Sequence, residues 1–341
     1  MAIIDKPSDY FNTVLYTGNG GTQAITGVGF KPDLNWIKDR DGTPSHVLHD
    51  IIRGVTKRLM SNNTNAEDTG SQINSFDTDG FTVPNNNNNT NGNDYVSWNW
   101  LGSNTTASNS NGSITSTVSF NATSGFSVVK YNGNGSNGAT IGHGLGVAPN
   151  LLLIKKTNGT ENWVVQNSAR GFNKYLYLDT TNAENTHSTD FVTSVSSTLI
   201  TLGTNGGVNN GSGEYICYAF ANKNGYSKIG SYTGNGNADG TFVYTGFKPA
   251  MIIIKQTNEA RDWLIIDNKR LGYNVKNYDL HPNDTAAEDT RERLDLVSNG
   301  FKMRDASNAN NKSGGSYIYM AFAENPFVTS TANGSIPTTA R

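Results

Sequence analysis

The sequence of 341 residues contains a single cysteine, Cys217, and few charged residues. One cysteine excludes an internal disulfide framework and any zinc site built on cysteine ligands. Charged residues make up 16% of the chain, the formal net charge is −2, and the lysines and arginines are dispersed. This balance gives no electrostatic footprint for nucleic acid or for an anionic membrane surface. We therefore expect no nucleic-acid partner, and a fold that is stabilised by packing.

Long apolar runs are also missing. No run approaches the ~20 apolar residues that are needed to span a bilayer. Residues 1–7 lack the apolar core of a secretory signal peptide. We expect no membrane insertion, and synthesis in a cytoplasm without Sec export.

The composition favours short strands. Hydrophobic residues make up 35% of the chain and aromatic residues 10%, and much of the remainder is Asn, Thr, Ser and Gly. Such a composition is typical of strands joined by polar turns, or of disorder. Disorder is disfavoured because the apolar residues are grouped into strand-length runs rather than scattered.

A pattern that occurs three times is the most informative feature present. In each copy a lysine lies 6 residues after a proline and an arginine lies 21 residues after it. The three sets are Pro32, Lys38 and Arg53; Pro149, Lys155 and Arg170; and Pro249, Lys255 and Arg270. The prolines are 117 and 100 residues apart, which is a domain-sized period. We infer a triplicated module of roughly 100 residues.

Other motifs repeat around this core. Each copy opens on a tyrosine followed by a Gly-Asn-Gly turn, at residues 16–20, 131–135 and 232–236. Each has a middle element that begins Ala-Glu, at residues 66–69, 183–186 and 287–290. Each closes on an aromatic-rich strand, at residues 95–100, 215–220 and 317–322. The repeat therefore spans whole modules rather than one motif.

The spacing predicts an all-β fold of three tandem antiparallel β-sandwich modules that are jelly-roll-like, because short apolar runs alternate with turn signals. Each proline marks the entry of a buried strand. The boundaries are an N-terminal arm (1–9), module 1 (10–103), a flexible or irregular linker (104–112), module 2 (113–223), module 3 (224–327) and a C-terminal tail (328–341). Module 2 has an extra candidate hairpin, 114–120 with 126–131, and the Ala-Glu element is a candidate for a short helix.

The histidines give no repeated constellation. His46 and His49 precede Asp50, yet His46 occupies the position of Trp163 and Trp263 in the other copies. Residues three apart in a strand point to opposite faces, so His46 and His49 do not converge on one metal ion. The remaining histidines, His143, His187 and His281, have no counterparts. We predict no metal site and no cofactor.

The acidic residues offer one repeated candidate. Glu67, Glu184 and Glu288 recur, and with the repeated arginines they form either a functional pair or a structural ion pair or cap. We favour the structural role, because enzyme sites are rarely triplicated in full. Residues 77–80 resemble a fragment of a calcium loop, but their counterpart at residues 297–300 does not, so a plain turn is favoured. Residues 18–20 do not match a phosphate-binding loop, because the lysine and the following helix are missing. We predict no catalytic, cofactor-binding or metal-binding residues.

Two groups of residues are candidates for a recognition surface: the tryptophans and the loops rich in Asn and Gly. Trp98, Trp100, Trp163 and Trp263 form either a sugar-stacking platform or part of the core, and their recurrence in strands favours the core. Trp263 in particular is predicted to lie between the two sheets of module 3, so that its loss would unfold module 3 alone. The loops rich in Asn and Gly, residues 85–93, 203–213 and 305–315, are the better candidates for an exposed recognition surface.

The repeated motifs, from the opening Tyr-Thr-Gly-Asn-Gly to the closing run at residues 317–327, resemble modules in virion structural proteins of tailed bacteriophages, especially those of marine bacteria. The resemblance covers residues 10–327. It implies an exposed particle component without catalysis, made in the host cytoplasm and located in the virion. Its implied partners are other virion proteins and a host cell-surface glycan or protein, and it implies a homo-oligomer in the particle.

Three roles remain open at this point. A tail-fibre or host-recognition protein of adhesin type is the main expectation, because repeated sandwiches with variable loops suit it. A capsid decoration or head-fibre protein is the alternative, since three similar modules suit a threefold axis. A carbohydrate-active β-sandwich enzyme is the second alternative, and it is disfavoured because no pair of acidic residues stands out.

Overall fold

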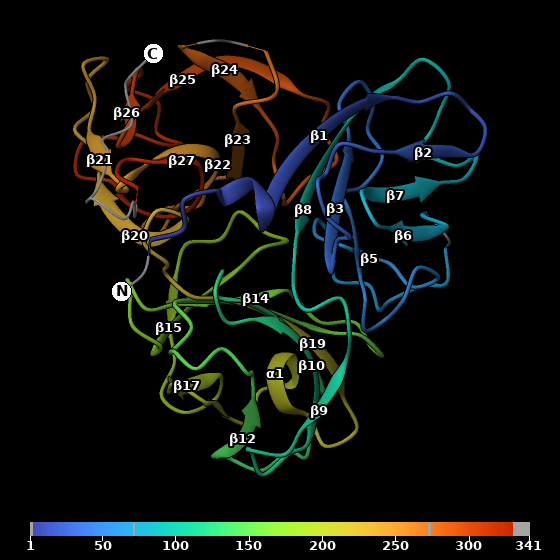
Figure 1. The fold of residues 1–341 in the computed structure, drawn as a ribbon. Helices are drawn as coiled ribbons and strands as arrows, with labels where there is room; N and C mark the ends of the chain where they lie inside the picture. The colour runs from blue at the N-terminus through green and yellow to red at the C-terminus, as the bar shows by residue number, and fades with distance from the viewer. Residues whose placement is uncertain (1–2, 71, 272–273, 330–341) are drawn as a thin grey trace.

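We analysed a computed structural model of the chain, which describes residues 3–70, 72–271 and 274–329. The described chain is almost entirely β-structure in antiparallel sheets, as the sequence predicts. Its three lobes, each drawn in one part of the colour range, lie around a common centre (Figure 1). A larger sheet of each lobe faces the centre, and a smaller sheet lies farther out.

Module 1 is built from two sheets. The larger has the order β1 (Phe11–Thr17), β8 (Asp94–Trp100), β3 (Leu34–Asp39), β4 (Val47–Asp50) and β5 (Leu59–Met60). The smaller has the order β2 (Gln23–Ile25), β7 (Gly80–Val83) and β6 (Ser75–Asp77). A short 3-10 helix, η1 (Pro7–Asp9), precedes β1.

Module 2 has the largest sheet. Its order is β16 (Asn185–Thr186), β15 (Lys174–Tyr177), β14 (Val164–Asn167), β13 (Leu151–Lys156), β19 (Glu214–Phe220), β11 (Phe126–Asn132), β10 (Ser116–Asn121) and β9 (Ala107–Asn109). The smaller sheet has the order β12 (Ala139–Gly142), β18 (Leu199–Leu202) and β17 (Val192–Val195). One helical turn, α1 (Gly206–Asn209), precedes β19.

Module 3 has two sheets of four strands each, and the larger is the one whose strands are longer in total. One has the order β20 (Ser227–Thr233), β27 (Ser316–Pro326), β22 (Phe247–Gln256) and β23 (Trp263–Asp267). The other has the order β21 (Phe242–Tyr244), β26 (Gly300–Met303), β25 (Asp289–Val297) and β24 (Lys276–Asp279).

The three larger sheets share one pairing scheme. In each, the closing strand lies between the opening strand and the strand that follows the repeated proline. The register is also shared: Leu34, Leu151 and Met251, each two residues after the proline, pair with Trp100, Phe220 and Phe322. This register is set by the fixed spacing of the repeat, because a slip of one residue would turn every buried side chain to the other face. Superposition of whole modules stays a prediction.

Several local predictions can be compared with the structure. The hairpin of module 2 is confirmed, since β10 pairs with β11 from Thr117 to Asn121. The expected linker 104–112 is not irregular throughout, because β9 within it pairs with β10. In module 3 the strand begins before its proline, and the register shifts around Pro249, where the ladder loses one N–H. The Ala-Glu elements are not helical, and the helical turn α1 lies in another loop.

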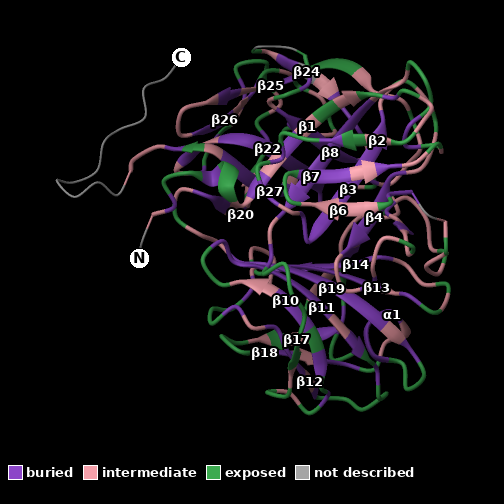
Figure 2. Ribbon diagram, turned by 45° about the vertical axis from the view of Figure 1, so that its right-hand side comes forward, coloured by how far each residue is buried: buried purple, intermediate pink, exposed green. Residues whose placement is uncertain are grey.

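A central core joins all three modules. Buried side chains of the three larger sheets form one cluster, and the buried parts of the ribbons meet at the centre in Figure 2. At its middle the rings of Trp100, Phe220 and Phe322, which are equivalent positions on the three closing strands, contact one another with centroids 5.5 to 6.0 Å apart. Each module also has its own apolar cluster between its two sheets.

The location predicted for Trp263 is wrong in one respect. The side chain is buried, as expected, but it lies in the central core and not between the sheets of module 3. Its Nε1 donates to the carbonyl oxygen of Tyr177 in module 2 at 2.9 Å. Trp163 likewise donates to the carbonyl oxygen of Met60 in module 1 at 2.8 Å. The sequence period marks these tryptophans as buried, but it does not say which module covers them.

The accessible surface area is that of one compact unit rather than of three separate domains. The chain exposes 12178 Å². Three separate domains, each of one third of its mass, would together expose about 18000 Å². The difference is the surface that the modules bury against one another.

Candidate functional site

The asparagine-rich loops, predicted to be the recognition surface, are in part internal scaffolding. Asn89, Asn209 and Asn311, one in each loop, are fully buried. Each accepts a backbone N–H of the Gly-Asn-Gly turn through Oδ1, at 2.9 Å from Asn19 and Asn134 and at 3.1 Å from Asn235. Their Nδ2 groups donate back to carbonyl oxygens of the same region. The central asparagine therefore fixes the loop. The residue before it, Asn88, Val208 or Asn310, is buried as well, so contact is left to exposed positions such as Asn210.

Stacked tyrosines complete this arrangement, which we call the Tyr-Asn clamp. The three pairs, with ring centroids 4.9 to 5.1 Å apart, are Tyr16 with Tyr95, Tyr131 with Tyr215, and Tyr232 with Tyr317. The hydroxyl of Tyr215 accepts from Asn210 N at 2.7 Å and donates to Gly206 O at 2.7 Å, and its equivalents do the same in the other loops. The Tyr-x-Gly-Asn-Gly motif is thus explained by structure and not by ligand binding.

The repeated glutamates and arginines form ion pairs, as the structural interpretation predicts. Within the modules Arg170 pairs with Glu184 at 2.6 Å, Arg270 with Glu288 at 3.0 Å, and Arg53 with Glu67 at 3.6 Å. The sequence did not indicate that the same glutamates also lie at the junctions between modules.

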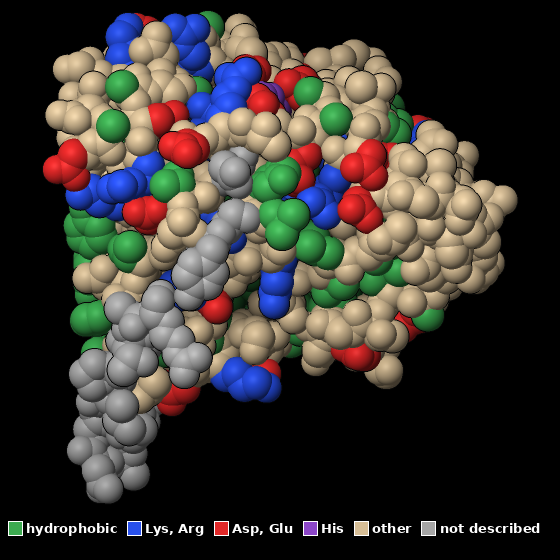
Figure 3. Space-filling model, turned by 90° about the horizontal axis from the view of Figure 1, so that it is seen from above, with side chains coloured by type: hydrophobic (Ala, Val, Ile, Leu, Met, Phe, Trp, Pro, Cys, Tyr) green, Lys and Arg blue, Asp and Glu red, His purple; other side chains and the backbone are tan. Residues whose placement is uncertain are grey.

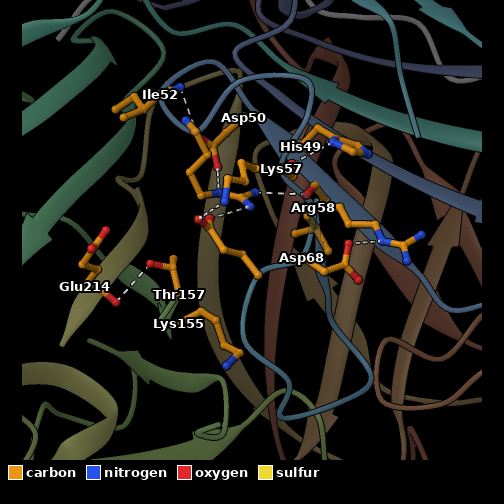
Figure 4. Close-up of polar contacts among 12 residues, drawn as sticks. His49, Asp50, Ile52, Lys57, Arg58, Asp68, Lys155, Thr157 and Glu214 are labelled. Atoms are coloured by element: carbon orange, nitrogen blue, oxygen red, sulfur yellow. Dashed lines mark hydrogen bonds and ion pairs between the residues drawn. The ribbon is translucent and has the colours of Figure 1, made fainter. Parts of the chain in front are cut away.

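Backbone hydrogen bonds of these glutamates cross the junctions. The N–H groups of Glu67, Glu184 and Glu288 donate to the carbonyl oxygens of Thr157, Thr257 and Arg40, each in the next module, at 2.7 to 2.8 Å. The acceptors lie 8 residues after the three prolines, so the contact recurs at one position of the repeat. Figure 4 shows one junction, where Asp50 and Lys57 of module 1 lie near Lys155 and Thr157 of module 2, and Thr157 contacts Glu214 of its own module.

The repeated lysines are buried at the same junctions. Lys155 Nζ donates to Thr64 O in module 1 at 3.1 Å, and Lys255 Nζ donates to Thr181 O in module 2 at 3.2 Å. Burial lowers the pKa of Lys38, Lys155 and Lys255 to about 8. A lysine of lowered pKa is a candidate for catalysis, but these ammonium groups are bonded to backbone carbonyls and have no exposed surface. Lys155 and Lys255 therefore link neighbouring modules, whereas Lys38 donates to carbonyl oxygens of Asp39 and Gly42 in its own module.

A second set of bonds across the junctions involves buried carboxylates. The Tyr218 hydroxyl donates to Asp50 Oδ2 at 2.8 Å, and Trp98 Nε1 donates to Asp267 Oδ2 at 3.1 Å. In module 3 the equivalent of Trp98 and Tyr218 is Met320, which cannot donate a hydrogen bond. The module 2 equivalent of the two aspartates is the neutral residue Asn167. An aspartate thus stands at this position only where a side-chain donor of the neighbouring module faces it, because a buried carboxylate without partners is costly.

His46 and His49 are both fully buried. Trp36 Nε1 donates to His46 Nδ1 at 3.0 Å, and His49 Nδ1 lies 3.0 Å from Lys57 O. Burial lowers the pKa of both imidazoles, that of His49 to about 3. His46 takes the place of the tryptophans that link the other modules, and its imidazole faces the His281 backbone of module 3.

One group of side chains has the composition of a metal site. Asp262, His281 and Asp284 bring their ligand atoms within 4.8 Å of one another. His281 Nδ1 lies 3.0 Å from Asp284 Oδ2, and Asp279 Oδ2 lies 3.8 Å from His281 Nε2. Burial by itself lowers the pKa of His281, but the two aspartates raise it to about 9. His281 and Asp284 form an ion pair near the junction of modules 1 and 3.

The tryptophans are buried and cannot stack on a sugar. The exposed large side chains of the described chain include Phe242 and Tyr244, with 47% and 59% of their surface accessible. Both lie on β21, two residues apart and therefore on one face of the strand. Tyr244 borders a groove of about 270 Å³ that Asn222, Asn224 and Lys228 also line. Ala24 and Thr140 occupy the register of Phe242 in the other modules, and Gly142 occupies that of Tyr244 in module 2, so the aromatic pair occurs in module 3 alone.

The comparisons bear on the whole arrangement. The family described as a domain of unknown function (DUF7483) matches residues 6–326. The chain belongs to this family. No curated protein and no solved structure matches the chain. The family match is continuous over all three modules, which agrees with a central core to which all three modules contribute side chains.

Two further features of the site region bear on function. The described residues contain no helix that is long and apolar enough to cross a membrane. On the face seen in Figure 3, uncharged polar side chains and backbone dominate, and lysines and arginines are interspersed with acidic residues. The exposed aromatic pair and its groove were missed by the sequence analysis, and their signal was a departure from the repeat, Phe242 and Tyr244 on an outward-facing edge strand.

Proposed function

We propose that the chain is an exposed structural component of a tailed-bacteriophage particle without catalysis, and that it acts in host recognition as a tail-fibre or adhesin-like protein. The proposal starts from the resemblance of the repeated motifs to virion modules. Its partners are then other virion proteins and a glycan or protein of the host surface, and its location is the virion.

The aromatic pair of module 3 is the observation that carries the recognition role. In a repeated protein the features common to all copies serve the scaffold, and here they include the Tyr-Asn clamps, the buried lysines and the ion pairs. Phe242 and Tyr244 depart from the repeat and are exposed, and Tyr244 borders the groove that Asn222, Asn224 and Lys228 also line. Aromatic faces that stack on sugar rings, with amides that bond hydroxyls, suit a glycan ligand.

The absence of catalysis is part of the proposal. Among the described residues, the repeated glutamates and lysines that would be candidates for acid-base chemistry are bonded to arginines or backbone carbonyls. Incubation with host envelope polysaccharide is expected to release no oligosaccharide. Release that Glu184→Gln or Glu288→Gln abolishes would contradict the proposal.

Binding to host polysaccharide tests the recognition role directly. The double variant Phe242→Ser/Tyr244→Ser is expected to bind about 5- to 150-fold more weakly, since each aromatic contact contributes ~0.5 to 1.5 kcal/mol. Leu15→Ser is the matched control, because Leu15 is an exposed apolar side chain of module 1, 37% accessible. Equal affinities of the double variant and the control would reject a glycan role for this surface.

A capsid decoration or head-fibre protein is the second candidate. The equivalent contacts of Trp100, Phe220 and Phe322 give the chain an approximately threefold arrangement, which suits a threefold position on a capsid. Electron microscopy of particles with a label on this chain distinguishes the candidates, because label at the tail tip supports the first and label on the capsid faces supports the second.

A further inference from the structure

The outer edge of β12 in module 2 is covered by a short segment of the same chain. Ile114 forms a parallel bridge with Ile141, and Ile114 N donates to Thr140 O at 2.9 Å. Ser113 N donates to Thr140 Oγ1, and Thr140 N donates to Ser113 Oγ, both at 2.9 Å. A Cβ on Gly112 would lie 2.3 Å from Thr140 O, so this position requires glycine. The sequence Asn-Gly-Ser-Ile at residues 111–114 therefore has a structural role as an edge cap.

The same four residues occur at one other place in the chain. Residues 333–336 also read Asn-Gly-Ser-Ile, and they lie in the C-terminal tail, outside the described residues. Both segments follow a closing strand of a module after a stretch rich in Thr, Ser, Ala and Asn. The shared sequence includes the glycine that the close approach requires and the serine that bonds the edge.

The equivalent edge of module 3 has no such cover in the described chain. β21 lies at the end of its sheet, with β26 on one side. Phe242 pairs with Lys302 and Val243 with Phe301, in the register in which Thr140 pairs with Thr201 and Ile141 with Ile200. Since N–H and C=O of Thr140 both point to the cap, those of Phe242 point to the free side of β21.

The tail begins close to this edge. Phe327 N donates to Gly246 O at 3.1 Å, and Val328 lines the same groove as Tyr244. The five residues 329–333 can extend up to about 17 Å, whereas a strand of three residues such as β21 is about 10 Å long. Gly334 can therefore reach the beginning of β21, and residues 334–336 can then run parallel to it.

We propose that residues 333–336 pair with the free edge of β21 in the same chain, in the way that residues 111–114 pair with β12. In this arrangement Ser335 lies opposite Phe242, and Ile336 lies opposite Val243. The occupant is the tail itself, and it extends the outer sheet of module 3 by one strand. This inference does not depend on the proposed function.

Disulfide trapping tests the pairing in the purified full chain. The variant Ser335→Cys/Phe242→Cys joins the two opposed positions, and Phe242 is exposed enough to be replaced. Ser113→Cys/Thr140→Cys is the positive control, because those hydroxyl oxygens lie 3.5 Å apart. Ser335→Cys/Ala24→Cys is the negative control, which tests pairing with the other free edge, because Ala24 occupies the same register on the free edge of β2 in module 1. The native Cys217 is buried and is no competitor.

Mild oxidation is expected to give an intrachain disulfide in the Ser335→Cys/Phe242→Cys variant at a rate within tenfold of the positive control. The negative control Ser335→Cys/Ala24→Cys should give no disulfide. Failure to cross-link when the positive control does so, cross-links between chains, or preferential cross-linking to Ala24→Cys would each overturn the proposal.

Hydrogen exchange of the Phe242 amide gives a readout without cysteines. Truncation after Val328 is expected to speed this exchange at least tenfold, because the amide loses its acceptor, and Gly334→Val should have the same effect. The Thr140 amide is the internal control and should not change, since its acceptor Ser113 is retained. A Phe242 amide that exchanges equally in all three proteins would overturn the pairing.

Discussion

At the scale of single residues, the opening glycine of each Gly-Asn-Gly turn shows how closely the clamp is packed. A Cβ on Gly133 would lie 2.3 Å from Asn210 O, a distance that no relaxed structure accommodates. We expect Gly133→Ala to lower the free energy of unfolding by about 1 to 3 kcal/mol, the usual cost of overpacking. Gly211→Ala is the control, because its nearest neighbour would be 3.6 Å away. Chemical denaturation of both variants measures the difference, and equal stabilities would contradict the packing argument.

The pH dependence of stability is also set by a single residue, His281. Burial alone would lower its pKa, but Asp279 and Asp284 raise it from 6.5 to about 9. A pKa raised on folding stabilises the fold fully below pH ~6.5, and the contribution is lost as the pH rises through ~9. The shift corresponds to at most about 3 kcal/mol. We therefore expect His281→Gln to be less stable than the natural protein at pH 6 and to differ little near pH 10.

Denaturation at several pH values checks this difference, and titrating groups that do not interact with His281 cancel in the comparison. Asp284 is expected to act in the opposite direction, because the imidazolium holds its pKa below the usual value even though burial raises it. Its contribution is present above pH ~4 and is lost as the pH falls. A stability difference between His281→Gln and the natural protein that does not depend on pH would exclude an imidazolium at this position.

At the scale of elements, each asparagine-rich loop combines a buried asparagine that holds the loop in place with exposed residues that do not. Asn209 is fully buried, accepts from Asn134 N, and donates to Ser136 O and Gly203 O at 2.9 Å. Asn209→Ala leaves these groups without partners, which costs at least about 2 kcal/mol. Asn210→Ala, at the exposed neighbouring position, should cost less than about 1 kcal/mol. Thermal unfolding of the pair tests the clamp, and similar losses would mean that the loop is held by its backbone alone.

The elements also show how far the sequence is informative. The strands after the prolines, the hairpin of module 2 and the burial of the tryptophans were predictable, because apolar runs and repeated positions report burial directly. The role of Asn209 was not, because a polar side chain in a polar loop gives the same signal whether it faces solvent or the backbone. The partner of a buried group is equally hidden: Glu184 was recognised as paired with Arg170, but its contact with Thr257 of the next module has no local signature.

At the scale of the whole molecule, the modules depend on one another. Their larger sheets meet in a common core, and backbone bonds, lysines and buried carboxylates cross the junctions at equivalent positions. The repeat period suggested three bodies that fold separately, because each module has the length of a domain. The sequence could not reveal the shared core, since apolar residues between two sheets and apolar residues between two modules follow the same pattern.

The unfolding of Trp263→Ala therefore differs from what independent modules would give. Trp263 is buried in the central core, and its indole is bonded to Tyr177 of module 2. Removing it should cost about 3 to 5 kcal/mol, and the loss reaches two modules at once. We expect calorimetry to show a single transition at a lower temperature, with equal calorimetric and van't Hoff enthalpies. Phe301→Ala, within the cluster of module 3 alone, should shift that same transition. A separate early transition of about one third of the total enthalpy in either variant would mean that module 3 unfolds by itself, and that the contacts at the junctions are too weak to couple the modules.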